Sequence, residues 1–482
     1  MRYSKILMVF IFAVLYIACK HEEKLQPLPE TGYPSEIEAL VINKCSNSGC
    51  HNLASHDAAA GLNLETWENL FQGSRGGAVV IPFRPDFSTF CYYTNSDTLL
   101  GITLQPTMPF NSTPLSTAEY MTFHNWIQNG APNKSGFVKF SDYQDKSKLY
   151  ISNRGCDVVT VLDPESGLAM RYIDVGTSSG IEGPSMIKVS PDKSHWYVIL
   201  DHGTTIQKFS SADNSKVGEL YIGPGFWSSV IITQDSKKAF IADANIIGRI
   251  IYVDLENMQL LTTYQTGLRY PLNMCINNSS SLLYATSQEG NYIYKIDISD
   301  PYNPVIAEIS LETGIPVSIV QTLNPYSIIL SQDQTRYYVT CHKSAELRIV
   351  QTSNDSLVGT YETGSNPAEM ITSPAYPYVF ISCLGVPGTN KLSVINVFDI
   401  NSNVFLPEIY AGHDSKGIMI DEGSSKLYVA NRNVSIGGPA AHHEPVCDDG
   451  KNGYITAIDL NTLQLIPGYK AELSVEPYHI SK

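Results

Sequence analysis

The feature that most constrains the fold is a repeat that extends from about residue 140 to the end of the sequence. From about residue 140, a turn followed by a short strand with a central aromatic residue recurs seven times. The aromatic residue is Tyr150, Tyr197, Phe240, Tyr284, Tyr338, Phe380 and Tyr428. Successive members are 42 to 54 positions apart, which leaves room for four short strands in each unit. Such units pack around an axis as blades, so the sequence predicts an all-β, seven-bladed β-propeller over residues 140–482.

The strands beside the aromatic strand repeat as well. In five units a following strand ends at an aspartate, namely Asp163, Asp254, Asp297, Asp399 and Asp459. An apolar strand that often begins with proline precedes the aromatic strand, as at Pro184, Pro325 and Pro367. The C-terminal segment 477–481 matches this preceding strand but has no later blade to join. We therefore expect it to complete blade one and remove the free edge of the ring; the competing choice is that residues 137–140 do so.

The first part of the chain has a different pattern. A chain of 482 residues is too long for one ordinary core, so at least two domains are expected. Residues 36–134 have the pattern of helices and loops. Ser116 to Glu119 form a capping-box pattern that opens a helix with Tyr120, Phe123 and Trp126 on one face. The predicted architecture is a small all-α domain followed by the all-β propeller.

The most specific chemical motif is Cys45-Ser-Asn-Ser-Gly-Cys50-His51. Two thiols can add to the vinyl groups of a haem, and the adjacent imidazole can then bind the iron. The usual motif has two residues between the cysteines, whereas this one has four. The alternatives are a Cys45–Cys50 disulfide or a zinc site. Zinc would need a second ligand pair, and the nearby candidates have no paired spacing: His56, Cys91 and His124.

The surroundings of this motif resemble a known family. Residues 36–134 resemble the planctomycete-type cytochrome c domain, with a helix before the motif (37–43) and Gly61-Leu62-Asn63-Leu64 after it. Thr107-Met108-Pro109 and Trp126-Ile127-Gln128-Asn129-Gly130-Ala131 follow in order. The resemblance implies one covalent haem c, attached at Cys45 and Cys50, with His51 and Met108 as axial ligands. Met121, inside the closing helix, is a weaker candidate for the second ligand, and the alternative for Met108 is a core methionine.

This ligand set favours electron transfer over catalysis at the iron. A thioether favours ferrous iron and so raises the reduction potential, and a six-coordinate iron has no open position for substrate. The sequence therefore favours an electron carrier, and if the chain is an enzyme, we expect an oxidoreductase.

The repeats resemble YVTN-type propellers, with Tyr428-Val429-Ala430-Asn431 as the nearest local match. This resemblance implies the fold and hardly any activity, because propellers include both enzymes and interaction modules. The loops before the first strand and after the second strand of each blade share one face. They place His202, His342, His413, Arg154 and Arg432 on one rim, with His442, His443 and Cys447 in the longest loop.

These rim residues support two interpretations. His442, His443 and Cys447 could hold a metal or a second cofactor, or contact the haem domain. Alternatively, rim loops are polar and histidines occur there by chance. Of the other cysteines, Cys275 and Cys341 sit in apolar strands, which favours buried free thiols.

The N-terminus predicts export. Arg2 and Lys5 precede an apolar run over 6–18, which is too short to span a membrane. Ala18-Cys19 resembles a bacterial lipoprotein cleavage site, and the charged residues after it resemble those of Bacteroidetes lipoproteins. Residues 1–18 are thus expected to be a signal peptide, Cys19 the lipidation site and 19–35 a tether. Ordinary signal cleavage, with Cys19 incidental, is the alternative.

The expected location is the periplasmic or cell-surface side of a bacterial membrane, at the outer membrane. The formal net charge of −15 argues against nucleic acid as a partner. The first hypothesis is an anchored monohaem cytochrome that exchanges electrons with a redox partner protein and uses its propeller for docking. The second is an oxidoreductase with a substrate, which the sequence does not identify, or a second cofactor at the rim. The third is a surface interaction protein.

Overall fold

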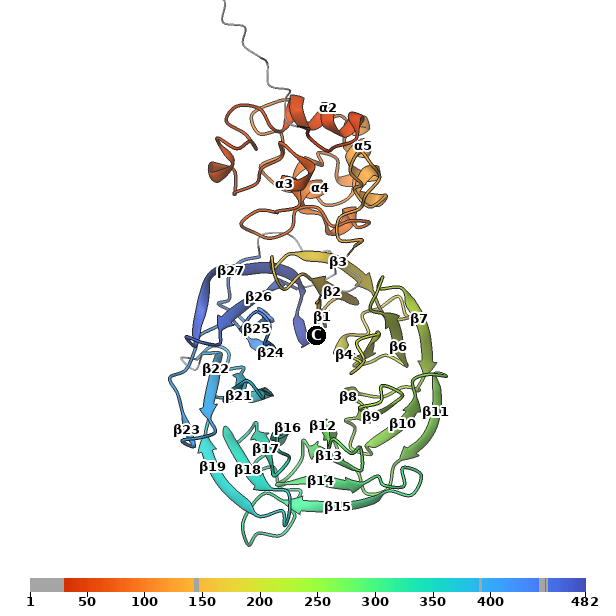
Figure 1. The fold of residues 1–482 in the computed structure, drawn as a ribbon, viewed down its shortest axis with the longest axis vertical. Coiled ribbons are helices and arrows are strands. Elements are labelled where there is room, and N and C mark those ends of the chain that lie inside the picture. The colour runs from red at the N-terminus through yellow and green to blue at the C-terminus, as the bar shows by residue number, and fades with distance from the viewer. Residues whose placement is uncertain (1–29, 143–146, 390–391, 442–446, 448–449) are drawn as a thin grey trace, which may run out of the picture.

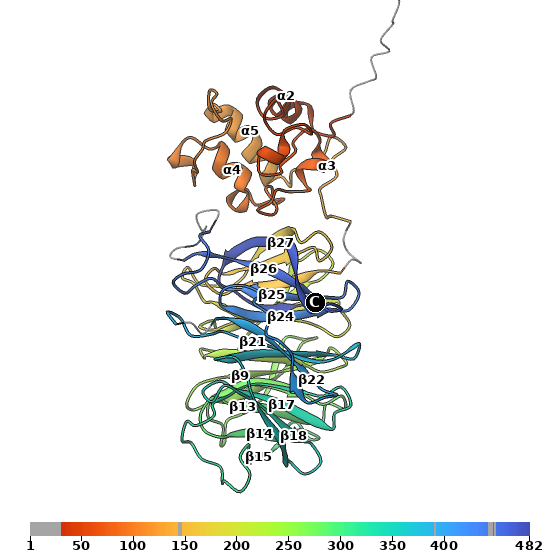
Figure 2. The ribbon, with the colours of Figure 1, turned by 90° about the vertical axis from the view of Figure 1, so that its left-hand side faces the viewer.

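The computed structural model describes residues 30–142, 147–389, 392–441, 447 and 450–482. The chain forms a seven-bladed β-propeller with a small N-terminal region of a few short helices (Figure 1). In both views the helical region lies beyond the edge of the propeller disc, next to blades one and seven (Figures 1 and 2). The helices therefore cover neither face of the disc.

Each blade is a four-stranded antiparallel sheet. Its strands lie side by side, with the first strand nearest the propeller axis and the fourth at the outer edge. From the axis outwards, blade one is β28 (Pro477–Ser481), β1 (Leu149–Asn153), β2 (Val158–Leu162) and β3 (Ala169–Asp174). Blade two is β4 (Pro184–Val189), β5 (His195–Leu200), β6 (Thr205–Ser210) and β7 (Lys216–Tyr221). Blade three is β8 (Trp227–Ile232), β9 (Lys238–Asp243), β10 (Arg249–Asp254) and β11 (Gln259–Tyr264). Blade four is β12 (Pro271–Ile276), β13 (Leu282–Ser287), β14 (Tyr292–Asp297) and β15 (Val305–Ser310), and blade five is β16 (Pro325–Leu330), β17 (Arg336–Cys341), β18 (Glu346–Gln351) and β19 (Leu357–Glu362). Blade six is β20 (Pro367–Ser373), β21 (Tyr376–Cys383), β22 (Val394–Asp399) and β23 (Val404–Phe405), and blade seven is β24 (Ser415–Asp421), β25 (Lys426–Asn431), β26 (Asn452–Asp459) and β27 (Gln464–Val475).

The repeated aromatic residue explains how neighbouring blades pack. All seven predicted aromatic residues lie in the second strand of a blade, and each is at most 3% exposed. Tyr150 of blade one, for example, packs against Trp196 of blade two, with ring centroids 5.4 Å apart. Burying a large side chain of this kind stabilises the fold by roughly 1.5–3 kcal/mol, so the repeat supplies one such contribution per blade.

The repeated aspartate ends its strand by capping a turn. Asp254 closes β10, and its carboxylate accepts hydrogen bonds from the backbone N–H groups of Glu256 (2.8 Å) and Asn257 (3.0 Å). Asp459 does the same at the end of β26. A short acceptor side chain at this position satisfies donors that the ladder leaves unpaired, which fixes where the chain turns back.

The C-terminal strand closes the ring, as the sequence predicted. β28 pairs antiparallel with β1, with Ile480 opposite Ile151 and Ser481 opposite Tyr150. Ile480 is 1% exposed and belongs to the same apolar cluster as Ile151. The competing choice, residues 137–140, forms no strand, and Phe140 instead packs against both the helical core and the core between blades one and two.

Within residues 30–142, the helical region has four α-helices, none longer than 12 residues, and three short 3-10 turns. They are α2 (Ser35–Lys44), η1 (His56–Ala58), α3 (Trp67–Leu70), η2 (Pro85–Phe87), α4 (Thr89–Thr94), η3 (Thr98–Leu100) and α5 (Thr117–Gln128). The predicted capping box is present: the Ser116 hydroxyl accepts from the Glu119 N–H, and the Glu119 carboxylate accepts from the Ser116 N–H. α5 packs against both α2 and α4. Among the described residues, no helix has the length and apolarity needed to cross a bilayer.

The two regions meet at the outer strands of blades one and seven, and the most detailed of these contacts involves β3. The Arg84 guanidinium donates to the Tyr172 carbonyl oxygen (3.1 Å) and to Asp174 (2.8 Å), both on β3. The Phe87 ring stacks on the Tyr172 ring, with centroids 4.4 Å apart, and Ile81 is buried beside it. This mixture of apolar stacking and charged hydrogen bonds holds the helical region against the outer strand of blade one.

Candidate functional site

The Cys45–His51 motif forms a tight loop at the end of α2. The Cys45 N–H donates to the Val41 carbonyl as the helix ends, and the His51 N–H donates back to the Cys45 carbonyl at 3.1 Å. Gly49 has a φ of +83°, a left-handed conformation that favours glycine. The four intervening residues are therefore accommodated by a closed loop that keeps both cysteines and the histidine on one short segment.

Asn52 holds this loop together, and the sequence analysis did not single it out. Its side chain donates to the Asn47 carbonyl (2.6 Å) and accepts from the backbone N–H groups of Ala54 (3.0 Å) and Ser55 (3.1 Å). The side chain is buried, although amides are usually exposed. A buried amide directly after the motif histidine fixes the loop between the cysteines. The asparagine next to His51 is the sequence feature that could have indicated this role.

His51 is oriented as a metal-binding histidine would be. Its Nδ1 atom lies 3.2 Å from the Leu62 carbonyl oxygen, which can only accept a hydrogen bond. Nδ1 therefore carries the proton, and the lone pair of Nε2 is left for a ligand. Burial lowers the pKa of His51, which favours the neutral imidazole. Iron-binding histidines commonly donate their second N–H in this manner.

The segment 61–64, singled out by the family resemblance, supplies this orientation. Leu62 provides the carbonyl that accepts from His51, and the Leu64 N–H donates to the His51 carbonyl at 2.9 Å. Leu64 is also 2% exposed within the helical core. The segment thus holds both the side chain and the backbone of His51 against the helical core.

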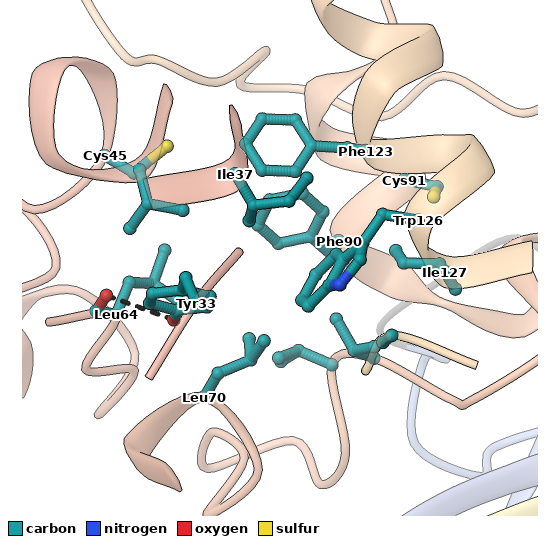
Figure 3. Close-up of a cluster of buried hydrophobic side chains, with 14 of the residues drawn as sticks. Tyr33, Ile37, Cys45, Leu64, Leu70, Phe90, Cys91, Phe123, Trp126 and Ile127 are labelled. Atoms are coloured by element: carbon teal, nitrogen blue, oxygen red, sulfur yellow. Dashed lines mark hydrogen bonds between the residues drawn. The ribbon is translucent and has the colours of Figure 1, made fainter. Parts of the chain in front are cut away.

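The two cysteines differ in their surroundings. Cys45 is 9% exposed and lies at one side of the apolar core formed by α2, α4 and α5 (Figure 3), whereas Cys50 is half-buried. Burial, with Cys50 nearby, raises the pKa of the Cys45 thiol to about 12, so it is neutral at physiological pH. Both are free thiols in the structure. The site therefore offers two thiols and one imidazole beside an apolar cluster, a donor set that fits a covalently attached haem.

Met108 lies on the loop between α4 and α5. Its N–H donates to the Tyr93 carbonyl at 2.7 Å, and the Leu104 N–H donates to the Tyr92 carbonyl at 2.9 Å. These bonds hold the loop against α4, and Met108 itself is half-buried. Met121, the weaker candidate, packs on α5 against the helical core. The sixth-ligand role of Met108 stays a prediction.

The zinc alternative gains no support from the described residues. Nowhere in the described parts of the chain do three histidine, cysteine or acidic side chains converge in a manner suited to a metal ion. His56 turns its Nδ1 to the Leu53 carbonyl at 3.0 Å, and Cys91 is buried in α4.

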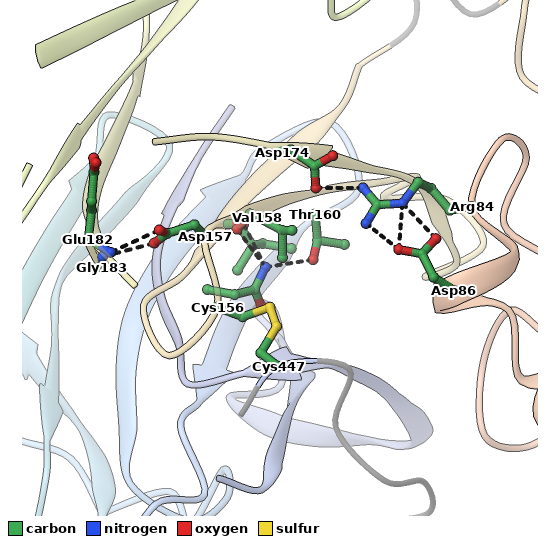
Figure 4. The surroundings of a disulfide bond; sticks show 12 residues. Arg84, Asp86, Cys156, Asp157, Val158, Thr160, Asp174, Glu182, Gly183 and Cys447 are labelled. Carbon is green, nitrogen blue, oxygen red and sulfur yellow. Dashed lines mark hydrogen bonds and ion pairs between the residues drawn. A yellow bond between two sulfur atoms is a disulfide. The ribbon is translucent and has the colours of Figure 1, made fainter. Parts of the chain in front are cut away.

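A disulfide joins Cys156 and Cys447, 291 residues apart in sequence (Figure 4). Cys156 lies in the turn between β1 and β2, and Cys447 in the loop between β25 and β26, with their Cα atoms 5.5 Å apart. The bond therefore links blade one to blade seven across the seam where the ring closes. The sequence analysis placed Cys447 in a candidate rim site, but a sulfur in a disulfide does not act as a thiolate ligand.

Other predicted rim residues gather around the mouth of the central channel. The carboxylate of Glu476 binds both Arg154 (3.3 Å) and Arg432 (3.0 Å). His342 stacks on Tyr326 with centroids 4.9 Å apart, and His202 lies 5.6 Å from Phe226. The Nε2 atom of His413 lies 2.8 Å from the Ser435 hydroxyl. His442, His443 and Cys19 lie outside the described residues.

Comparisons with known proteins identify the propeller fold. No family model and no curated protein matches the sequence. Among solved structures, Kuenenia stuttgartiensis hydrazine synthase superposes with a TM-score of 0.50 at 14% identity, over 64% of this chain and 91% of that one. A functionally unknown protein from Desulfotomaculum acetoxidans DSM 771 superposes with a TM-score of 0.51 at 12% identity, over 69% of this chain and 100% of that one. At such low identity these similarities establish the seven-bladed propeller and nothing about activity.

Proposed function

We propose that the chain is an exported c-type cytochrome, in which one haem is attached to Cys45 and Cys50 and bound by His51, and which transfers electrons. The observation that carries this proposal is the orientation of His51, whose Nδ1 is bound by the Leu62 carbonyl and whose Nε2 is left to bind a metal. A bound haem c would supply one-electron redox chemistry at this site.

In this proposal the protein residues position and shield the haem. Cys45 and Cys50 anchor it, Leu62 fixes the imidazole, and Asn52 keeps the loop in one conformation. Met108 would be the second protein ligand of the iron and would leave no open position for substrate. The apolar core beside Cys45 would keep water away, which favours a high reduction potential.

Export is part of the same proposal. Disulfides persist in oxidising compartments outside the cytoplasm, and the Cys156–Cys447 bond fits such a compartment. Cytochromes c are assembled on that side of the membrane too. We propose that residues 1–18 direct export, that Cys19 carries a lipid at the outer membrane, and that the propeller serves as a docking platform for a redox partner protein.

The proposal is tested by producing the full chain in a bacterium that matures c-type cytochromes. The wild-type protein should carry one haem that survives denaturation, measured by absorbance and by the mass of the intact chain. The Cys45→Ala/Cys50→Ala variant should lose this covalent haem entirely. Cys91→Ala is the matched control, since it removes a buried free thiol of the same region, and it should retain the haem.

A second pair of variants tests the role of His51. In His51→Gly the haem should stay attached but change its spectrum and potential, and added imidazole should restore both. His56→Gly, which changes a neighbouring histidine with its Nδ1 on Leu53, should leave them unchanged. A wild-type chain without covalent haem in a competent strain would refute the proposal and leave a surface interaction protein as the remaining hypothesis.

The second candidate function is an oxidoreductase that binds a substrate on the propeller. The observation that favours it is a cavity on the propeller axis, lined by charged and apolar side chains from all seven blades. A substrate that reduces the haem only when this cavity is intact would favour the enzyme over the electron carrier.

A further inference from the structure

The loops between blades one and two hold two neighbouring carboxylates. Asp157 lies in the turn between β1 and β2, and Glu182 lies in the loop from β3 to β4 (Figure 4). Among the described residues, no ion pair joins either of them to a cation. The cation closest to Asp157 in sequence, Arg154, is bound to Asp201 and Glu476 instead. The two negative charges therefore have no positive side chain to balance them.

Backbone donors fix the positions of both carboxylates. The N–H groups of Glu182 and Gly183 donate to the Asp157 carboxylate at 2.8 and 2.9 Å (Figure 4). The Oε1 atom of Glu182 accepts from the N–H groups of Thr177 (3.1 Å) and Ser178 (2.6 Å). These hydrogen bonds orient the two side chains, but they supply dipoles and no compensating unit charge.

The second oxygen of Glu182 has no such donor. Glu182 is 6% exposed, and its Oε2 atom is buried without a hydrogen-bond partner among the described residues. A Cβ atom on Gly176 would lie 3.4 Å from this oxygen and 3.2 Å from the Asp157 Oδ2 atom, so both oxygens border the same space. The Leu200 side chain borders it too. A buried charged oxygen without a partner is costly, and a bound ion or water is a usual reason that one is retained.

A third oxygen without a partner belongs to Thr205, the first residue of β6. Thr205 is 5% exposed, and its hydroxyl is buried without a hydrogen-bond partner among the described residues. Because side chains alternate along a strand, Thr205 shares a face of β6 with Gln207, whose amide binds the backbone N–H and C=O of Gly176 at 3.0 and 3.1 Å. The Oε2 atom of Glu182 lies 3.0 Å from the Cβ position of Gly203, two residues before Thr205. The unpartnered hydroxyl therefore faces the same loop as the two carboxylates.

This donor set consists of oxygen atoms only. Two carboxylates and a hydroxyl suit a hard cation, whereas zinc prefers nitrogen and sulfur ligands. Calcium accepts six to eight oxygen ligands in irregular geometry, with water among them, and magnesium demands a nearly ideal octahedron. Three segments that approach from different directions match calcium better. Burial and the neighbouring Glu182 charge also raise the pKa of Asp157, a cost that a divalent cation would relieve.

We propose that the loops between blades one and two bind one calcium ion through Asp157, Glu182 and Thr205, with water completing the coordination. The ion would join the turn after β1, the loop before β4 and the turn before β6, and so hold neighbouring blades together on one face of the propeller. The site is separate from the haem motif and does not depend on haem attachment.

The test is calorimetric titration of the full chain, freed of metal with EDTA, with calcium chloride, and with magnesium chloride as the comparison. We expect one saturable calcium site with a Kd on the order of 0.1–1 mM, as in extracellular calcium-binding modules, and at least about tenfold weaker binding of magnesium. Glu182→Gln should abolish calcium binding, because it keeps the acceptor Oε1 and replaces only the unpartnered charged oxygen. In EDTA this variant should unfold at the wild-type temperature or above, which separates lost binding from misfolding. Asp157→Asn should weaken binding at least about tenfold.

Asp213→Asn is the matched control. Asp213 lies in the turn between β6 and β7, where its carboxylate accepts from the Ser215 N–H at 3.1 Å, and this variant should bind calcium as the wild type does. No saturable calcium binding by the wild type, equal binding of magnesium, or unchanged affinity in Glu182→Gln would overturn the proposal. Because the titration can be made on the Cys45→Ala/Cys50→Ala variant too, its failure would be distinct from failure of the haem proposal.

Discussion

The helical region (30–142) and the propeller (147–482) differ in how their backbones are held. The longest helix, α5, has 12 residues, and much of the helical region is loop fastened by single hydrogen bonds such as that from His51 to the Cys45 carbonyl. In the propeller, every strand is paired in a four-stranded sheet, and the sheets pack face to face through repeated aromatic residues. The propeller is thus stabilised by its own repeated ladder.

The comparison suggests that a bound group would contribute more to the stability of the helical region than to that of the propeller. A small region with few backbone ladders gains stability when a covalent group fills its core, as metal-bound small domains do. The propeller is held by the ladders of its seven sheets. The following predictions test this difference, from the largest expected effect to the smallest.

The largest effect is expected from deletion of residues 476–482, which removes β28. The deletion would expose the edge of β1, and the buried Ile480 would be lost. We expect the propeller to lose most of its free energy of unfolding, on the order of 5–15 kcal/mol for a domain. Thermal unfolding followed by circular dichroism measures this.

Removal of Lys482 alone is the control, because it removes only an ion pair to Asp421 and leaves β28 in place. A propeller that unfolds at the wild-type temperature after the longer deletion would show that closure through β28 is not what stabilises the ring.

The disulfide should have the next largest effect. Cys156→Ser/Cys447→Ser removes the covalent link across the seam, with an expected loss of about 2–4 kcal/mol. The effect should be confined to the propeller transition in calorimetry. Reducing agent should lower the wild-type transition to that of the variant and leave the variant itself unchanged. An equal fall in the helical transition would mean that the two regions unfold together.

Acid should destabilise the propeller through His479. Burial, together with Lys188 and Lys416, lowers the pKa of His479 from 6.5 to about 4, while Glu369 acts in the opposite direction. The unfolded chain therefore binds a proton that the folded chain does not between these two values. This stability is fully present above pH 6.5 and is lost as the pH falls to about 4, by on the order of 3 kcal/mol.

The variant His479→Gln checks this prediction. It should flatten the dependence of the free energy of unfolding on pH in the window between 6.5 and 4, measured by urea denaturation at several pH values. Identical slopes for the variant and the wild type would assign the acid sensitivity to other groups.

The smallest effect concerns the contact between the regions. Arg84→Ala removes the hydrogen bonds to Tyr172 and Asp174, with an expected loss of about 1–2 kcal/mol from the helical region. Its calorimetric transition should fall by about 5 °C while the propeller transition stays in place. Arg75→Ala, which changes a more exposed arginine paired with Asp57, is the control and should shift neither transition.

Local patterns in the sequence were sufficient for much of the fold. The seven aromatic residues, the aspartates at strand ends and the proline at the start of β4, β16 and β20 each belong to a short pattern that repeats from blade to blade. The closing strand β28 was predictable because it repeats the pattern of an inner strand. The capping box of α5 is local in the same sense. The cysteine–histidine spacing of the motif loop was likewise readable, although the Asn52 contacts that hold the loop were not.

Contacts between distant segments required the tertiary structure. Cys156 and Cys447 are far apart in sequence, and no spacing rule pairs them. The cations around Tyr478 come from blades one and seven, and the Leu62 carbonyl reaches His51 only after the loop folds.

The sequence by itself determined the repeat, and hence the number and order of the blades, because side-chain periodicity and turn residues act over a few positions. Only the tertiary structure decided which blade faces the helices, which cysteines are bonded and which charges share the axis. These depend on how the ring closes, and closure brings together residues that no local pattern relates.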